Sequence, residues 1–321
     1  MKLQTQIPLQ KQSDNLIDYN SNILLLGSCF VENIGEKLSY FKFQNLQNSF
    51  GILFQPKAIE TLISSAINHR EYSEKDIFFC NEQWHCFEAH SKLSNPSKDV
   101  LLSNLNHAVE ATNQQINTST HIIITLGTAW VYRFLESNQL VANCHKVPQR
   151  QFDKELLSVE TITQSLEAIV DSIKSVNPKV SIIFTVSPVR HIKDGFVENT
   201  QSKAHLISAI YQFLNRQSSI DNRQLSYFPS FEIMMDELRD YRFYAEDMLH
   251  PNQTAIHYIW EKFQEVWMSH DAIKTMKVVD EVQKGLQHKP FNPNSEAHQK
   301  FILGLKERQI QLQKEYLHMK F

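Results

Sequence analysis

Two short segments at opposite ends of the sequence carry side chains suited to nucleophilic catalysis. Near the start, an apolar run over residues 23–26 leads directly into Gly27 and Ser28. Near residue 250, Asp247 and His250 stand three positions apart, a spacing that lets both side chains meet on one face of a turn. A serine hydroxyl, an imidazole and a carboxylate are the nucleophile, the general base and the orienting acid of a serine hydrolase. The chain order serine, aspartate, histidine suits a hydrolase built on an α/β sheet.

The pattern around Ser28 predicts a strand, a tight turn and a helix. The continuous apolar run is typical of a buried parallel strand, and Gly27 permits a turn with positive φ because it has no Cβ. Residues 30–38 have the apolar spacing of a helix. We therefore expect Ser28 at the carboxyl end of a strand and beside a helix N-terminus, where free N–H groups favour an oxyanion. The alternative is that Ser28 only caps this helix.

The segment around His250 has its own alternative interpretation. A carboxylate beside an imidazole fixes the tautomer of the ring and stabilises its protonated form, as a general base requires. Pro251 suits the first turn of a new helix, and residues 255–263 continue with a helical apolar stripe. The alternative is a capping aspartate beside a surface histidine. Cys29 is a second candidate nucleophile, and with Ser28 in that role we expect Cys29 to point into the core.

Several further segments are distinctive in both composition and order. The chain contains Gly27-Ser-Cys-Phe30, Asn48-Ser-Phe-Gly-Ile-Leu53, Trp84-His85, Leu126-Gly-Thr-Ala-Trp-Val-Tyr132, Val141-Ala-Asn-Cys-His-Lys146, Thr185-Val-Ser-Pro-Val-Arg-His191 and Tyr241-Arg-Phe-Tyr-Ala-Glu-Asp-Met-Leu-His-Pro251. With these segments the chain resembles the GSCFA family, a branch of the SGNH/GDSL-like hydrolases, over roughly residues 20–265. Val31 stands where the family usually has alanine.

The resemblance implies roles for individual residues. Ser28 matches the nucleophile, and Asp247 and His250 match the acid and base of the last conserved block of such hydrolases. Gly51 matches the glycine whose backbone N–H, with that of Ser28, forms part of the oxyanion hole. The asparagine that usually supplies the third donor is replaced by Ala129.

Either a neighbouring side chain then supplies the third donor or the oxyanion hole is built differently. Asn143, His145 and Thr128 are the candidates, and Asn143 is preferred. Removal of one such donor raises a barrier by about 2.7–4 kcal/mol, so its true absence would mean a slow enzyme or a binding protein.

The function expected from the resemblance is hydrolysis of a short acyl ester, with a small-molecule or carbohydrate-linked ester as substrate. The alternatives are an O-acyltransferase that uses the same acyl-enzyme, and a catalytically silent ligand-binding module. The candidates for substrate binding are Thr128, His145, Arg190, His191, Trp84 and His85. Arg190 has the alternative role of a buried partner to an acid of the fold, and the aromatic residues have the alternative role of core packing.

Composition excludes several classes of function. The net charge of −3 comes without a basic stripe, so we expect no nucleic-acid partner. No apolar run approaches the ~20 residues that span a membrane, and residues 1–14 lack a signal-peptide core. The four cysteines, without paired spacing, favour a reducing compartment and hence the cytoplasm. The 14 histidines show no metal-binding spacing, so we predict neither metal nor cofactor.

The order of predicted elements indicates an α/β fold. Strands over 121–126 and 180–186 alternate with helices over 156–176 and 203–216, and residues 78–87 suggest a small hairpin or cap. With the resemblance, we expect an SGNH-hydrolase-like three-layer α/β/α domain with a central, mainly parallel sheet over residues 15–268. Residues 269–321, with a helix from residue 296 onward, are expected to form a C-terminal helical extension packed on that domain. The alternative for this region is a contact within a homo-oligomer.

Overall fold

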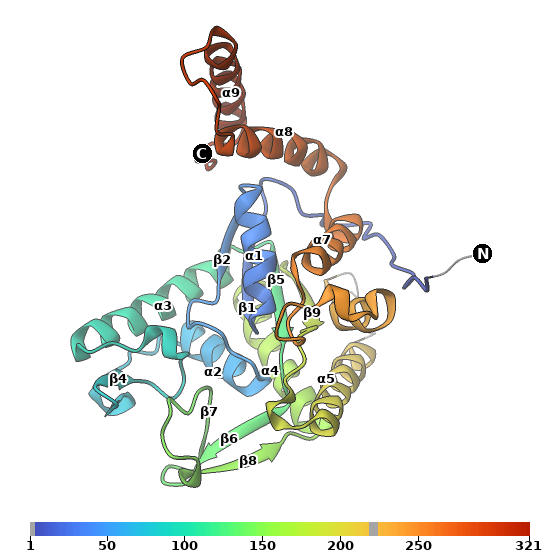
Figure 1. The fold of residues 1–321 in the computed structure, drawn as a ribbon. Helices are drawn as coiled ribbons and strands as arrows, with labels where there is room; N and C mark the ends of the chain where they lie inside the picture. Colours follow the sequence, from blue (N-terminus) through green and yellow to red (C-terminus); the bar gives the residue numbers. More distant parts are fainter. Residues whose placement is uncertain (1–3, 218–223) are drawn as a thin grey trace.

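The computed structural model describes residues 4–217 and 224–321, and a five-stranded sheet lies at its centre (Figure 1). Every neighbouring pair of strands in this sheet is parallel. In spatial order the strands are β2 (Gln44–Gln47), β1 (Asn22–Gly27), β5 (His121–Leu126), β9 (Ser181–Val186) and β10 (Leu225–Phe228). The predicted strands at 23–26, 121–126 and 180–186 are thereby confirmed.

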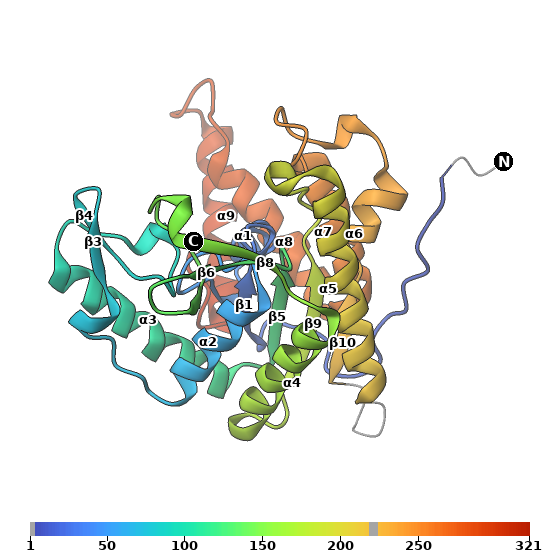
Figure 2. The ribbon, with the colours of Figure 1, turned by 90° about the horizontal axis from the view of Figure 1, so that it is seen from below.

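Helices cover both faces of the sheet because alternate residues of its buried strands point to opposite sides. Leu24 and Ile122 pack in one apolar cluster, whereas their neighbours Ile23 and Ile123 pack in the other. The first cluster is shared with α2 (Pro56–Ile67), α3 (Lys98–Thr118), α4 (Val159–Val176) and α5 (Phe196–Arg216), and the second with α1 (Phe30–Tyr40) and α7 (Gln253–Trp267). Figure 2 shows the sheet between the two sets of helices. The predicted three-layer α/β/α architecture is confirmed.

The strand order places β1 at the point where the winding of the sheet reverses. The chain leaves β1 toward β2 on one side and later returns to β5 on the other. Open α/β sheets bind their ligands at such a point, outside the carboxyl ends of the strands. Ser28 follows β1 and Gly127 follows β5, so both residues lie at this edge.

Smaller elements surround the carboxyl edge of the sheet. Three antiparallel strands form one unit, β7 (Gln139–Val141), β6 (Trp130–Phe134) and β8 (Phe152–Leu156), and a hairpin joins β3 (Phe78–Cys80) to β4 (Gln83–His85). The hairpin over 78–87 is therefore confirmed. The short helices are η1 (Glu74–Asp76), η2 (Ser91–Leu93), η3 (Gln149–Gln151), η4 (Ile192–Asp194), α6 (Ser230–Glu232), the π-helix η5 (Ile233–Leu238) and η6 (Tyr241–Phe243).

Two predicted helix starts are wrong by several residues. Helix α4 begins at Val159 rather than at residue 156, because β8 continues to Leu156 and the Ser158 side chain then caps the helix. Helix α5 begins at Phe196 rather than at residue 203, directly after Gly195, whose φ is +117°.

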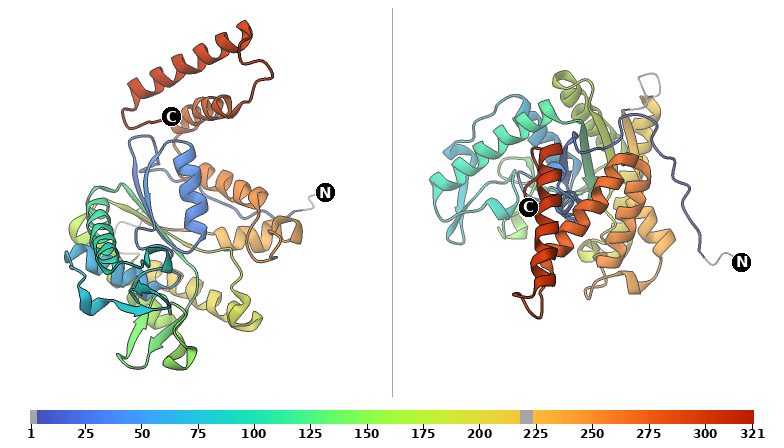
Figure 3. Two further views of the ribbon diagram at one scale, coloured as in Figure 1. Left: turned by 60° about the vertical axis from the view of Figure 1, so that its left-hand side comes forward. Right: turned by 90° about the horizontal axis from the view of Figure 1, so that it is seen from above.

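The C-terminal helices α8 (His270–Gln287) and α9 (Glu296–Glu315) form a pair that projects from the α/β body (Figure 3). Helix α8 contacts α1, since the Tyr40 hydroxyl donates to Asp280 at 2.9 Å. Tyr316, just after α9, packs its ring 4.9 Å from that of Tyr19. Among the described helices, none is long and apolar enough to cross a membrane.

Candidate active site

Ser28 lies at the bottom of the carboxyl edge, in a turn that only glycine permits. Gly27 has φ of +132°, and a Cβ there would stand 2.1 Å from the carbonyl oxygen of Thr125. Ser28 has no exposed surface, and its Oγ finds no hydrogen-bond partner among the described residues. Cys29, not Ser28, occupies the cap position of α1, and no side chain bonds there. The alternative that Ser28 is a helix cap is therefore wrong.

Asp247 and His250 form a hydrogen-bonded pair. The Asp247 Oδ2 and the His250 Nδ1 lie 2.5 Å apart. The Asp247 Oδ1 also accepts the backbone N–H groups of His250 and Leu249, each at 2.9 Å. These bonds, the backbone ones foremost, lower the pKa of Asp247 to about 2, so its carboxylate is ionised at neutral pH. Asp247 thus caps its turn and also orients the imidazole, while the separate residue Asn252 caps α7.

The hydrogen bond between Ser28 and His250 is not formed in this structure. The Oγ atom of Ser28 is buried without a partner, whereas the His250 side chain is 49% exposed. Catalytic hydrogen bonds are often long or absent without substrate and tighten in the complex. A movement that brings the imidazole to Ser28 is therefore required of any mechanism that uses both groups.

The segment that follows β9 lies beside the His250 turn. The Arg190 N–H donates to the Leu249 carbonyl at 3.3 Å. Burial foremost, with the charges of Lys203 and His250, lowers the pKa of His191 to about 4, so its ring is neutral at pH 7.

A chain of contacts joins His191 to Ser28. The ring of His191 meets the ring of Phe54 edge-on at 5.5 Å between centroids. Phe54 and Ser28 both border the space that a Cβ on Gly127 would fill. His191 and Ser28 therefore belong to one cluster at the carboxyl edge.

The sequence matches the model of a known protein family. The GSCFA family matches residues 22–263, three-quarters of the chain. The chain belongs to the GSCFA family. A second family, described as the C-terminal domain of GSCFA domain proteins, matches residues 279–321. A search of curated proteins found no match.

Unsatisfied polar atoms are concentrated at this edge of the GSCFA protein. Among the described residues, ten buried side-chain nitrogen or oxygen atoms have no hydrogen-bond partner. Five of them belong to Ser28, Asn48, Arg190, His191 and Asn199. Contacts connect these residues, since the Asn48 Oδ1 accepts the Gly27 N–H and the Asn199 Oδ1 accepts the His191 N–H, each at 2.9 Å. Because buried polar groups are normally satisfied, such a cluster indicates a site that meets its partners in a ligand.

The backbone donors expected for an oxyanion hole already have partners. The Ser28 N–H donates to the Thr125 carbonyl at 3.0 Å, and the Gly51 N–H donates to the Asn48 carbonyl at 2.7 Å. Asn143 accepts the His145 N–H at 2.9 Å through Oδ1. The Nδ2 of Asn48 is buried and without a partner, and its orientation follows because its Oδ1 must face the Gly27 N–H. Sequence reasoning missed it, although Asn48 opens the Asn48–Leu53 segment.

The other predicted site residues have contacts of their own. The Thr128 hydroxyl lies 3.1 Å from that of Ser202. His85 uses both ring nitrogens, with Ser94 at 2.7 Å and the Cys80 carbonyl at 3.0 Å, and Trp84 packs against Phe79 in the same hairpin.

His145 and Cys29 complete the set. His145 bonds the Cys86 carbonyl at 2.7 Å, and burial lowers its pKa to about 4. Cys29 is half-buried, whereas Ser28 has no exposed surface. Burial raises the pKa of the Cys29 thiol, although nearby Lys203 opposes that shift.

Lys203 is a buried cation that sequence reasoning also missed. Its Nζ donates to the carbonyl oxygens of Gly127 at 2.7 Å and Ser187 at 2.8 Å, the residues that directly follow β5 and β9. Burial lowers its pKa to about 7. Lys203 stands three and seven positions before Leu206 and Ile210, so its place within an apolar stripe was the available signal.

No metal site is built from the described residues. In the ranges 4–217 and 224–321, no three histidine, cysteine, aspartate or glutamate side chains come close enough to share an ion.

Proposed function

We propose that this GSCFA protein is a serine ester hydrolase that acts on a short acyl ester, in the manner of SGNH hydrolases. The observation that carries the proposal is the Asp247–His250 pair at the sheet edge that also holds the unpartnered Ser28 hydroxyl. An ionised carboxylate bonded to Nδ1 leaves the Nε2 of His250 as the proton acceptor. Ser28 has no other partner to compete for that base.

The proposed reaction proceeds in two acyl-transfer steps. The Ser28 Oγ attacks the ester carbonyl, gives its proton to His250, and forms a tetrahedral oxyanion. His250 then returns the proton to the leaving alcohol, and water, activated by the same base, releases the acid. For the oxyanion we propose the Nδ2 of Asn48 as a donor, because it is buried and unpaired beside Gly27. The backbone N–H groups of Ser28 and Gly51 contribute once the turn opens, and Asn143 is the further candidate.

Stability and function conflict at Ser28, which supports a catalytic role. A buried hydroxyl without a partner destabilises a fold, so alanine at this position would be neutral or stabilising. An unpartnered serine hydroxyl directly after the Gly27 turn therefore agrees with a catalytic role rather than a folding role.

A ligand-binding module is the second candidate function. Two observations favour it: Ser28 is buried, and the backbone N–H groups of Ser28 and Gly51 already donate to backbone carbonyl groups. Such a protein would bind an ester or its acid without turnover.

The test combines hydrolysis of p-nitrophenyl acetate with labelling by a fluorophosphonate probe. We expect both signals in the wild type and neither in Ser28→Ala, whose thermal midpoint should be no lower than that of the wild type. Cys29→Ala is the matched control and should keep both signals. If labelling is lost in Cys29→Ala and kept in Ser28→Ala, the nucleophile is the Cys29 thiol.

Two other results separate the alternatives. Labelling at Ser28 without turnover would favour an O-acyltransferase, to be confirmed by addition of sugar acceptors. Absence of both hydrolysis and labelling in folded wild-type protein would overturn the proposed hydrolase activity and favour the ligand-binding module.

Two further expectations accompany the proposal. All four cysteines are free, which supports a reducing compartment such as the cytoplasm. A carbohydrate-linked acyl group is the preferred substrate by analogy with related hydrolases.

A further inference from the structure

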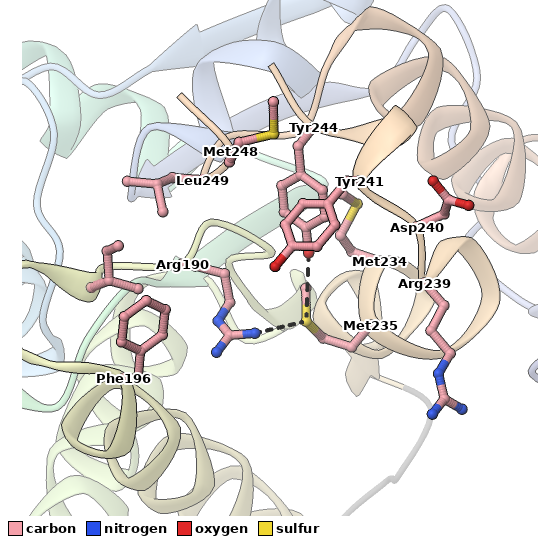
Figure 4. A pocket seen from close by; sticks show the side chains of 11 residues that line it. Arg190, Phe196, Met234, Met235, Arg239, Asp240, Tyr241, Tyr244, Met248 and Leu249 are labelled. Atoms are coloured by element: carbon pink, nitrogen blue, oxygen red, sulfur yellow. Dashed lines mark hydrogen bonds between the residues drawn. The ribbon is translucent and has the colours of Figure 1, made fainter. Parts of the chain in front are cut away.

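A cavity of about 310 Å³ opens beside the His250 turn, and Arg190 lies within it (Figure 4). Met248 and Leu249, the two residues before His250, form part of its wall. The Arg190 N–H is bonded to the Leu249 carbonyl, so the cavity and the Asp247–His250 pair share one piece of backbone. A molecule that fills this cavity therefore contacts the backbone turn that carries the candidate general base.

The guanidinium group of Arg190 has no acidic partner among the described residues. Its closest polar contact is the thioether sulfur of Met235 at 3.8 Å, a weak acceptor, and its Nε is buried without any partner. Arg190 is half-buried at the cavity wall, so an anion that enters the cavity would pair with it without displacing an acid of the fold.

The nearby acids are occupied elsewhere. Asp240 borders the cavity, but its carboxylate points away from Arg190 in Figure 4 and bonds the Arg242 N–H at 2.9 Å. Asp194 pairs with Lys154 at 2.6 Å. The fold thus leaves the charge of Arg190 for a ligand, and the alternative that Arg190 pairs with an acid of the fold finds no support among the described residues.

Apolar and aromatic side chains form the rest of the cavity. Phe196 and Tyr241 are 67% and 74% exposed, far more than is usual for such large side chains. The rings of Tyr241 and Tyr244 lie 5.9 Å apart, and both stand over the Arg190–Met235 contact in Figure 4. Flat apolar surfaces around one cation suit a ligand with a ring-like body and one negative charge.

We propose that this cavity holds the carboxylate-bearing half of the ester substrate, with Arg190 as the residue that selects it. The inference rests on the proposed function and narrows its substrate class to acidic esters. A carboxylate fits the planar guanidinium and matches its single charge. A phosphate, with a charge of about −1.5 to −2, would need further donors, and Arg239 points away from Arg190 in Figure 4.

The kinetic test compares 4-acetoxybenzoate with its neutral methyl ester. In Arg190→Met, which keeps the apolar stem, we expect kcat/KM for the acid to fall about 10- to 100-fold, mainly through KM, as one charge-assisted pair implies. The neutral ester should change less than about twofold. Arg242→Met is the matched control, because it removes an equal charge from a side chain that is 74% exposed and outside the cavity. Equal losses on both esters, or none on either, would overturn the proposal.

The binding test does not depend on turnover. Calorimetry on Ser28→Ala with 4-hydroxybenzoate should show binding that Arg190→Met abolishes and Arg242→Met retains. Binding without hydrolysis would uphold the acidic ligand while the esterase proposal fails. Phenyl phosphate that binds more tightly than 4-hydroxybenzoate would overturn the carboxylate assignment.

Discussion

The Asp247 carboxylate holds its own turn and orients His250, and only the second role depends on its charge. Its Oδ1 accepts two backbone N–H groups, which an asparagine oxygen can also do, while its Oδ2 faces the His250 Nδ1. Substitution by asparagine therefore preserves the turn and removes the charge that stabilises a protonated imidazole.

We accordingly expect Asp247→Asn to lower kcat on the order of 10²–10⁴-fold with little loss of stability. Steady-state kinetics at neutral pH, beside thermal unfolding, measure both effects. A kcat within threefold of the wild type would show that Asp247 acts only as a turn cap.

At the level of elements, Lys203 joins the ends of two central strands. The Lys203 amine, on α5, donates to the backbone carbonyl groups of Gly127 and Ser187, which directly follow β5 and β9. Its loss leaves two buried carbonyl oxygens without that donor, at a cost of about 1–3 kcal/mol for each unsatisfied group.

We expect Lys203→Met to lower the free energy of unfolding by roughly 2–6 kcal/mol, counted over the two carbonyl groups. Urea denaturation measures the change, and Lys193→Met, at an exposed position in η4, is the control that removes the same charge. Equal stability of the two variants would mean that the strand ends hold together without the amine.

The elements themselves were largely predictable, whereas the state of the site was not. Continuous apolar runs identified β1, β5 and β9, because a strand that is buried on both faces of a parallel sheet is apolar at nearly every position. The Asp247–His250 pair followed from local spacing. Asn48 and Lys203 escaped prediction because their roles come from contacts between distant segments, at separations of 21 and 76 residues. The burial of Ser28 beside Gly127 and Phe54 depends on loop geometry, which no local pattern encodes.

On the scale of the whole molecule, two apolar clusters hold the layers together, and the second reaches into the C-terminal region. Met276 and Val279 of α8 and Leu312 of α9 belong to the cluster that also contains Trp260 of α7. We propose that residues 269–321 are an extension of the domain over 15–268 that covers this face. The separate family match over 279–321 is consistent with that division.

Stability of the whole molecule should fall in mild acid. Burial lowers the pKa of both His145 and His191 from 6.5 to about 4, so both rings are neutral in the fold. Between those values the unfolded chain binds more protons than the folded chain. The stabilisation is complete above pH 6.5 and is lost as the pH falls toward 4, on the order of 3 kcal/mol for each ring.

Urea unfolding at pH 7, 5.5 and 4.5 measures this loss. In His145→Gln the position no longer titrates, and we expect a shallower decline with pH even where the variant is less stable overall. Parallel curves for wild type and variant would show that His145 does not contribute to the acid sensitivity.

The burial of Lys203 also offers a way to measure how often the carboxyl edge of the sheet opens. An amine with pKa near 7 is mostly unprotonated in weak alkali and would react readily with acylating reagents, yet this one is only 2% exposed. Solvent-exposed lysines would be modified first, and modification of Lys203 would wait until the β5 and β9 ends separate from α5. The time course of its acylation would then record how often the carboxyl edge of the sheet separates from α5, without any substrate being known.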